Sequence, residues 1–291
     1  MDTFWIWWQN LPANIDPVIF RIGGFRLQYY GLMYLVAFGL TYGLAIYRIH
    51  RRERRTLSRE QLQGLMTAMI IGVILGARLG YVLFYNFSYY LHHPLEIILP
   101  FEFANGLHFT GIAGMSYHGG LIGTITAAWY HIRKQGLNFR KTADFIVPCI
   151  PLGYTFGRLG NFINGELWGR VTTSSIGMHF PLSQDPLLLR HPSQLYEAFG
   201  EGIFLFIILW LLRNKFRTSG AMLSIYLVGY GLIRFIIEYF RQPDAHLGFI
   251  AFNLSMGQLL CMAMITAGIL FGIWAKRHPP PATETKRTRR K

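Results

Sequence analysis

Long apolar runs separated by short polar or basic segments dominate the chain. A helix needs about 20 mostly apolar residues to cross the hydrocarbon core of a bilayer, and seven runs come close to that length. The predicted spans cover residues 29–47, 62–86, 112–132, 143–162, 195–212, 220–240 and 256–275. The pattern therefore predicts an all-α integral membrane protein with seven transmembrane helices.

The fourth predicted span is the least regular. It contains Asp144, Pro148, Pro151 and Arg158. Such residues are tolerated at membrane depth where a helix is broken or lines a cavity. We therefore expect a broken or cavity-lining helix between residues 143 and 162.

Lysine and arginine are concentrated in four of the segments outside the spans. The stretches 48–59, 133–141, 213–217 and 276–291 hold 20 of the 28 basic residues. In a seven-span arrangement these four stretches lie on one side, which the excess of positive charge assigns to the cytoplasm. We therefore expect the N-terminus outside and the C-terminus inside.

The segments expected outside the cytoplasm differ from the basic ones. Residues 163–194 are polar by the standard of this chain and predict a small extracytoplasmic head region. Residues 1–10, with three tryptophans, predict an interfacial segment, since tryptophan favours the membrane–water boundary. We expect residues 1–278 to form one membrane domain and residues 279–291 a basic, disordered cytoplasmic tail.

Composition narrows the function classes. Charged residues make up 14% of the 291 residues, against about 25% in a typical soluble domain, which excludes a single soluble domain. The net charge is +14, but the basic residues lie between apolar runs, so nucleic acid is not an expected partner. Cys149 and Cys261 cannot form a disulfide framework, and no C-x-x-C spacing points to a metal.

Eight arginines are not explained by topology. They are Arg21, Arg26, Arg78, Arg158, Arg170, Arg190, Arg234 and Arg241. Arg78, Arg158 and Arg234 fall within or at the edges of predicted spans, where an arginine costs at least about 2.5–3.5 kcal/mol on insertion scales. Each of these three therefore needs an acidic partner, a water-filled cavity or an anionic ligand.

The stretch from residue 157 to residue 170 is the densest in polar groups. Glycine lets the backbone approach a ligand closely, and the planar fork of Arg158 suits a phosphate. Asn161 and Asn164 add neutral donors, and Glu166 can orient an arginine. A glycine-rich helix end with a structural Arg–Glu pair is the open alternative.

Tyr230, Arg234 and Glu238 follow one another at intervals of four residues. This spacing places them on one face of the sixth predicted helix. A polar stripe there favours the wall of a cavity. Mutual neutralisation of Arg234 and Glu238 is the alternative.

Two further side chains are candidates near the outer ends of spans. His118 can titrate near neutral pH, and Gly119 and Gly120 leave space around its ring; a satisfied structural histidine is the alternative. Tyr30 begins the first span, where an interfacial aromatic belt also explains it.

Residues 190–197 lead into the fifth predicted span. Ser193 and Glu197 there match a capped helix start.

Arginines, a histidine and amides near the outer half of the membrane suit the phosphate of an anionic lipid. No nucleotide-binding loop and no nucleophile elbow are present in the sequence. The residues by themselves leave two classes open, an enzyme acting on an anionic lipid and a transporter of an anionic lipid or solute.

Six blocks, in order, resemble bacterial phosphatidylglycerol–prolipoprotein diacylglyceryl transferases over nearly the whole chain. They are residues 29–34, 76–81, 116–121, 157–170, 191–197 and 229–245. The resemblance implies a multi-pass enzyme of the bacterial inner membrane whose active site faces the extracytoplasmic side. It implies no metal and no organic cofactor, and surrounding membrane lipids as partners.

The implied reaction moves the sn-1,2-diacylglyceryl group of phosphatidylglycerol onto the lipobox cysteine thiol in a prolipoprotein signal peptide. It forms a thioether and releases glycerol 1-phosphate, as the first step of lipoprotein maturation. By this resemblance His118 is the base, and Arg158 and Arg234 bind the lipid phosphate. The other matching positions are catalytic Tyr30 and substrate-binding Asn161, Glu166, Gly169, Tyr230 and Glu238.

Overall fold

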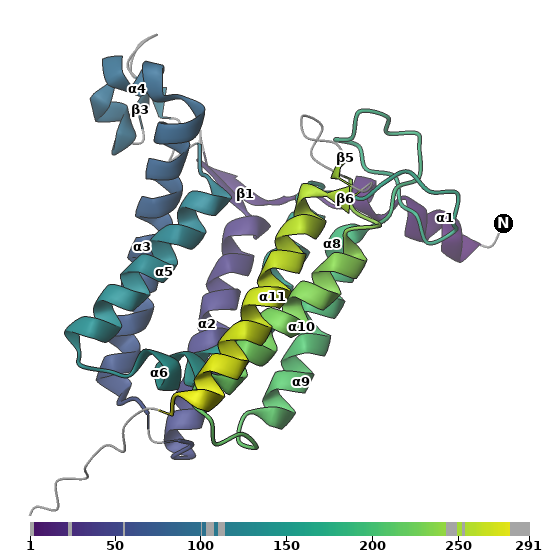
Figure 1. Cartoon of the computed structure of the whole chain (residues 1–291). Helices are drawn as coiled ribbons and strands as arrows, with labels where there is room; N and C mark the ends of the chain where they lie inside the picture. The colour runs from purple at the N-terminus through teal and green to yellow at the C-terminus, as the bar shows by residue number, and fades with distance from the viewer. Residues whose placement is uncertain are drawn as a thin grey trace, which may run out of the picture. The chain divides into compact units, whose positions relative to one another are not determined.

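The computed structural model describes residues 3–22, 25–54, 56–99, 101–102, 108–109, 114–242, 249–251 and 254–279 (Figure 1). The expected tail lies outside the described residues from position 280 onward, as do Pro243 and Asp244. The chain divides into two compact units, Arg55–Thr142 and the combination of Met1–Arg54 with Ala143–Lys291. Each unit is described by itself.

The larger unit carries most of the helices. Its elements are α1 (Thr3–Gln9), η1 (Leu11–Asn14), β1 (Val18–Ile22), β2 (Phe25–Gln28), α2 (Tyr29–His50), η3 (Val147–Cys149), α7 (Ile150–Ile163), α8 (Ser193–Glu197), η4 (Ala198–Phe204), α9 (Leu205–Leu212), α10 (Ala221–Ile237), β5 (Phe249–Ala251), β6 (Leu254–Ser255) and α11 (Met256–Arg277). The smaller unit holds α3 (Arg59–Tyr85), α4 (Phe87–His92), η2 (Pro94–Ile97), β3 (Phe101–Glu102), β4 (His108–Phe109) and α5 (Tyr117–Lys134). Helix α6 (Phe139–Ile146) crosses the boundary between the units.

Helices occupy all seven predicted runs. Four of the described helical stretches are long and apolar enough to cross a membrane, namely Tyr29–His50, Arg59–Tyr85, Ser193–Leu212 and Met256–Arg277. Helix α10 is apolar but shorter. The fourth run is broken, as its sequence predicts: α6, the 3-10 turn η3 and α7 follow one another, because Pro148 and Pro151 lack the N–H that a continuous helix requires.

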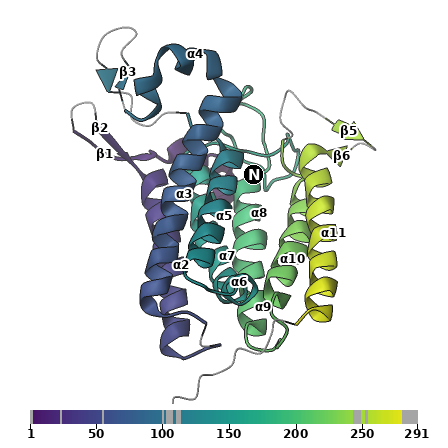
Figure 2. The same ribbon diagram turned by 60° about the vertical axis from the view of Figure 1, so that its left-hand side comes forward.

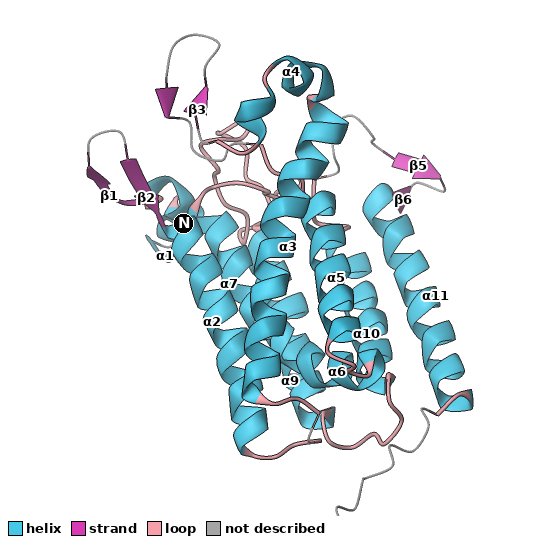
Figure 3. Cartoon of the chain, turned by 90° about the vertical axis from the view of Figure 1, so that its left-hand side faces the viewer, coloured by secondary structure: helices cyan, strands magenta, loops and turns pink. Residues whose placement is uncertain are grey.

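The purely helical prediction misses three short hairpins. Strands β1 and β2, β3 and β4, and β5 and β6 pair antiparallel, each as a two-stranded sheet (Figure 3). Arg21 lies directly opposite Arg26 in the first hairpin. Strands of two to five residues between long helices are too short to give a readable alternation in the sequence.

Close contacts between helices of the larger unit bring the residues of the candidate site together. A Cβ on Gly153 would lie 2.6 Å from Ala37 O, so α7 approaches α2 closely. A Cβ on Gly202 would collide with Thr155, so η4 approaches α7 in the same way. Helices α10 and α11 lie side by side (Figure 2). Small residues allow such approaches in lipid.

Residues 164–192 connect α7 to α8 and form a small core together with the end of α7 and the N-terminal segment. Phe162, Met178 and Phe180 are buried there, with Trp8 and Trp168 against them. The indole of Trp8 donates to Ile176 O at 3.0 Å. The N-terminal segment is therefore tied to this connection by side-chain contacts.

Arg78 in the smaller unit has a structural explanation. Its guanidinium donates to Ile97 O at 2.9 Å, to Gly114 O at 3.3 Å and to Glu96 O, and it lies 4.9 Å from the centre of the Tyr90 ring. Backbone carbonyls thus satisfy this cation and fix the segment after α3. These guanidinium nitrogens are therefore not available to bind an anionic ligand.

Candidate functional site

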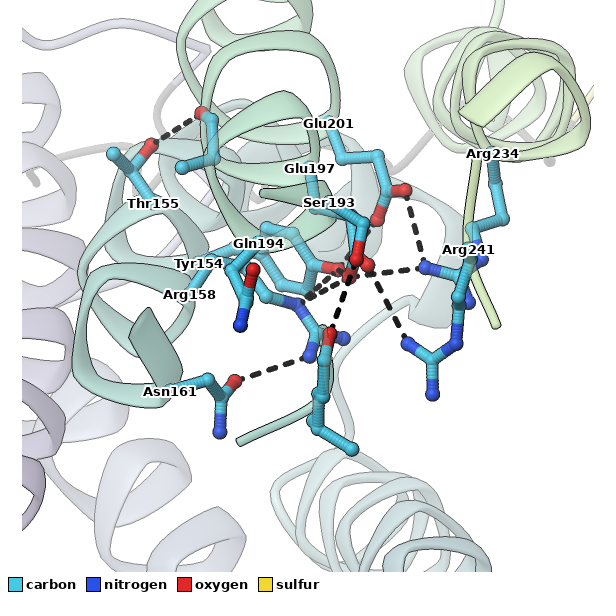
Figure 4. Close-up of polar contacts among 12 residues, drawn as sticks. Tyr154, Thr155, Arg158, Asn161, Ser193, Gln194, Glu197, Glu201, Arg234 and Arg241 are labelled. Atoms are coloured by element: carbon cyan, nitrogen blue, oxygen red, sulfur yellow. Dashed lines mark hydrogen bonds and ion pairs between the residues drawn. The ribbon is translucent and has the colours of Figure 1, made fainter. Parts of the chain in front are cut away.

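Glu197 on α8 is the centre of a buried cluster of charges (Figure 4). Its side chain has no exposed surface, and Oε2 lies 2.8 Å from Nε of Arg158 on α7 and 3.0 Å from Nη1 of Arg234 on α10. Oε1 lies 3.4 Å from Nη1 of Arg241, which follows α10. Three guanidinium groups from two helices and a loop therefore share one carboxylate.

A tyrosine and a second carboxylate complete the buried side of the cluster. The hydroxyl of Tyr154 accepts from Nε of Arg158 at 2.6 Å and donates to Glu201, with Glu197 Oε2 3.4 Å away. Glu201 also lies 3.5 Å from Arg234. These contacts pair Arg158 and Arg234 with partners in the protein interior. A buried charge is stable only when it is paired in this way.

The predicted face of α10 is present. Nη2 of Arg234 lies 2.9 Å from Glu238 Oε2, one turn along the helix, and Ser255 Oγ donates to Glu238 Oε1 at 3.1 Å. The Tyr230 ring meets the Tyr154 ring edge-on, with centres 6.0 Å apart. Arg234 is thus more than the partner of Glu238, because its other contacts reach Glu197 and Glu201.

Asn161 links Glu166 to Arg158. Nη1 of Arg158 donates to Asn161 Oδ1 at 3.1 Å, and Asn161 Nδ2 donates to Glu166 Oε1 at 2.7 Å. Glu166 therefore acts on the arginine through the amide. Tyr30 lies beside this group, since a Cβ on Gly160 would be 3.4 Å from its ring.

Gly169 lies where the backbone segments that contain His191 and Phe240 approach it closely. A Cβ at this position would collide with Phe240 O and lie 2.7 Å from His191 O. The next residue, Arg170, donates from Nε to Arg241 O at 2.9 Å and from its backbone N–H to Phe240 O at 2.8 Å. Only glycine allows this approach, which places Arg241 beside the cluster.

His118 lies in the first turn of α5, in the unit Arg55–Thr142. The N-cap of this helix is Ser116, whose hydroxyl accepts from Gly119 N at 3.3 Å, and the His118 ring contacts Tyr117 edge-on at 5.6 Å. The arginines belong to the other unit, so the role of His118 as a base stays a prediction.

The predicted site residues omitted several members of the cluster. Glu197 and Glu201 are four residues apart in an apolar run, which is a readable signal for a functional carboxylate pair. The capped-helix explanation of Ser193 is wrong, because its hydroxyl donates to Leu167 O at 3.0 Å instead of capping α8. No periodic pattern in the sequence links Arg241 or Tyr154 to Glu197.

The ion pairs of the cluster leave some guanidinium nitrogens available. Arg158, Arg234 and Arg241 are paired with Glu197, Glu201 and Glu238. In the described part of the chain, Nη2 of Arg158 and Nη2 of Arg241 make no hydrogen bond. These two available donors suit an anionic oxygen such as that of a phosphate diester.

His191 lies at the edge of the cluster, outside the helices. Its Nδ1 is 3.1 Å from the hydroxyl of Tyr196, and its ring meets Phe240 edge-on. Burial lowers the pKa of His191, so this ring is neutral near pH 7 and adds no charge to the site.

Comparison with known proteins gives one consistent result. Residues 17–274 match the family model described as prolipoprotein diacylglyceryl transferase. The chain is 52% identical over 278 residues to a protein of Chlorobaculum tepidum, 48% over 266 residues to one of Coxiella burnetii and 44% over 274 residues to one of Paracidovorax citrulli. All three are named phosphatidylglycerol–prolipoprotein diacylglyceryl transferase, and the matches cover 91–95% of this chain and 96–97% of the relatives.

Proposed function

The chain belongs to the prolipoprotein diacylglyceryl transferase family, and from that premise we propose how its residues carry out the reaction. It is a transferase that moves the diacylglyceryl group of phosphatidylglycerol onto a prolipoprotein, the first step of lipoprotein maturation. The observation that carries the proposal for the site is the convergence of Arg158, Arg234 and Arg241 on Glu197.

We place the protein in the bacterial inner membrane with seven spans and the cluster toward the extracytoplasmic side. Glu197 lies at the start of the stretch Ser193–Leu212, and the basic residues Arg213, Lys215 and Arg217 follow the end of that stretch. Positive charge favours the cytoplasmic side. The charge pattern therefore supports a site at the opposite, outer end of this helix.

The arginines bind the phosphate of phosphatidylglycerol in this proposal. Guanidinium groups match phosphate oxygens with paired donors, and their inner sides are already fixed by Glu197 and Tyr154. Negative charge grows on the departing glycerol 1-phosphate as the reaction proceeds, and donors that are already in position stabilise it most. Glu166, Asn161, Tyr230, Glu238 and Tyr30 orient these donors.

The reaction is an alkyl transfer at the glyceryl carbon that bears the phosphate ester. The lipobox cysteine sulfur forms a bond to this carbon, the carbon–oxygen bond breaks, and the electron pair leaves with glycerol 1-phosphate. A free thiol has a pKa of about 8.5, so it needs a base or a positive field for a useful thiolate fraction. We assign the base to His118. The nucleophile comes from the substrate, so the buried Cys149 and Cys261 have no part in it.

The test uses the purified full chain in detergent with phosphatidylglycerol and a synthetic lipobox peptide. Mass spectrometry follows the peptide, and a coupled assay follows glycerol phosphate. A diacylglyceryl adduct with an equal amount of released glycerol phosphate is the expected result, and a peptide with serine in place of cysteine gives neither product.

Variants then separate the roles. Arg158→Ala and Arg234→Ala abolish both products, and His118→Gln lowers the rate more than the affinity for lipid. Lipid binding without adduct or release, while a known transferase works in the same assay, would overturn the proposal in favour of a transporter.

A further inference from the structure

Arg21 and Arg26 take no part in the charge cluster, and the charge asymmetry of the chain does not explain them. Both are exposed, and they lie directly opposite each other on β1 and β2. Among the residues that the structure describes, neither guanidinium makes an ion pair or a hydrogen bond. Like charges in directly opposite positions destabilise a hairpin, so an anion from outside the chain would stabilise this pair.

The hairpin of β1 and β2 has one basic face and one apolar face. Side chains directly opposite each other in an antiparallel pair lie on the same face, and the next pair along lies on the other face. Arg21 and Arg26 therefore share one face, whereas Phe20 and its partner Leu27 lie on the opposite face. Ile22, two residues after Phe20, lies on that opposite face as well. Phe20 is 44% exposed and Ile22 is 69% exposed, so the chain does not cover its own apolar face here.

The hairpin is attached to the start of a candidate membrane span. Strand β2 ends at Gln28, and α2, which is long and apolar enough to cross a membrane, begins at Tyr29. The backbone N–H of Tyr29 donates to Pro17 O at 3.0 Å, which fixes the base of the hairpin to the first turn of the helix. Figure 2 shows the two strands reaching away from this end of α2, as does Figure 3. The hairpin therefore lies where the span reaches the membrane surface.

These observations together match the surface of a bilayer that contains anionic phospholipid. An exposed apolar patch on a protein is typical of a membrane contact, and arginines close to that surface are attracted to anionic headgroups. The long arginine side chain can also extend from an apolar environment to the level of the phosphates. A soluble anion would pair with the arginines but would leave the apolar face in water.

We propose that the hairpin lies in the membrane interface, with Phe20 and Ile22 in contact with lipid and with Arg21 and Arg26 bound to the phosphate of an anionic phospholipid. This lipid is distinct from the one whose phosphate the cluster around Glu197 binds. The inference does not depend on the transfer reaction, because it uses only the hairpin and the span that follows it.

The experiment places a fluorophore on the apolar face. Cys149 and Cys261 are buried, so a thiol-reactive dye on an Ile22→Cys variant of the full chain reports on position 22. The protein is reconstituted in phosphatidylcholine vesicles that contain a small share of a lipid with a nitroxide on its acyl chain, either phosphatidic acid or phosphatidylcholine. We expect both lipids to quench the dye. At low salt the phosphatidic acid quenches about fivefold more, since one arginine near the surface favours anionic lipid by about that factor, and high salt weakens this preference.

Two double variants in the Ile22→Cys background test the arginines. Arg21→Gln with Arg26→Gln removes the preference for phosphatidic acid and leaves quenching by phosphatidylcholine unchanged. Arg51→Gln with Arg52→Gln is the matched control, because it removes the same charge from exposed positions just after the other end of α2, and it keeps the preference.

Two results would overturn the inference. Absence of quenching by either nitroxide lipid would show that the apolar face does not contact the membrane. An equal preference for phosphatidic acid in the two double variants would show that Arg21 and Arg26 do not bind the anionic headgroup. Neither readout requires transfer activity, so failure of the proposed reaction is distinguishable from failure of this inference.

Discussion

Oε2 of Glu197 lies 3.0 Å from Nη1 of Arg234, and the Glu197 side chain is fully buried. The two residues come from α8 and α10, so their contact fixes the spacing of these helices at the site. Removal of one partner from such a pair leaves an uncompensated charge, which costs about 3–5 kcal/mol. The pair is therefore both a structural link and the support of the arginine.

Glu197→Gln tests the central carboxylate. The substitution keeps the size of the side chain and removes the charge that three arginines share, so we expect transfer to fall at least about a hundredfold and the thermal midpoint to drop. Steady-state kinetics and thermal unfolding in detergent measure the two effects. Asp185→Asn, at an exposed position between α7 and α8, serves as the control and changes neither. A Glu197→Gln protein with the transfer rate and thermal midpoint of the unmodified protein would contradict the role of Glu197.

Arg241→Lys tests the arginine that the sequence patterns did not single out for the site. Lysine keeps the charge but loses the planar fork. Hydrogen bonds to charged groups are worth about 1.5–3 kcal/mol, so we expect the KM for phosphatidylglycerol to rise about tenfold or more, with a smaller change in kcat. Arg277→Lys at the end of α11 is the control. Equal KM values for both variants would exclude Arg241 from phosphate binding.

Gly169→Ala tests the backbone junction. The added Cβ would meet Phe240 O and His191 O, and overpacking of this kind costs about 1–3 kcal/mol. We expect a lower thermal midpoint together with reduced transfer, because Arg241 is displaced. Gly157→Ala is a matched control, since a Cβ there meets nothing within 4 Å, and its midpoint stays the same or rises. A Gly169→Ala protein as stable as the Gly157→Ala protein would show that the close approach of the backbones does not require glycine at position 169.

Glu53 lies near the C-terminal ends of α2 and α9. It makes the free energy of unfolding depend on pH in the acid range. Burial opposes its ionisation, but hydrogen bonds and charges from Arg48 and Arg213 outweigh burial and lower the pKa of Glu53. A carboxylate with a lowered pKa stabilises the fold at neutral pH, and this contribution is lost as the pH falls below the ordinary value, about 4.3, toward the lower folded value.

The measurement for Glu53 is the thermal midpoint between pH 7 and the acid range. We expect Glu53→Gln to lower the midpoint at neutral pH, where Arg48 loses its partner at 2.8 Å, and to flatten the decline in acid. Parallel curves for the variant and the unmodified protein would show that Glu53 contributes nothing to the pH dependence.

The hydrophobic pattern determined much of the fold. Seven apolar runs gave helices at nearly the predicted positions, and two prolines gave the break before α7. Helix position follows from local sequence because a bilayer requires long apolar segments with internally satisfied backbones. The three hairpins were missed because pairing of such short strands is not encoded by periodicity.

The site was determined by the sequence only in part. Sequence spacing placed Tyr230, Arg234 and Glu238 on one face, since neighbours on a helix follow from its period. It did not reveal that Glu197 binds three arginines or that Gly169 lies between two backbone segments. These relationships join residues far apart in the chain, so only the tertiary packing of α7, α8, η4 and α10 decided them.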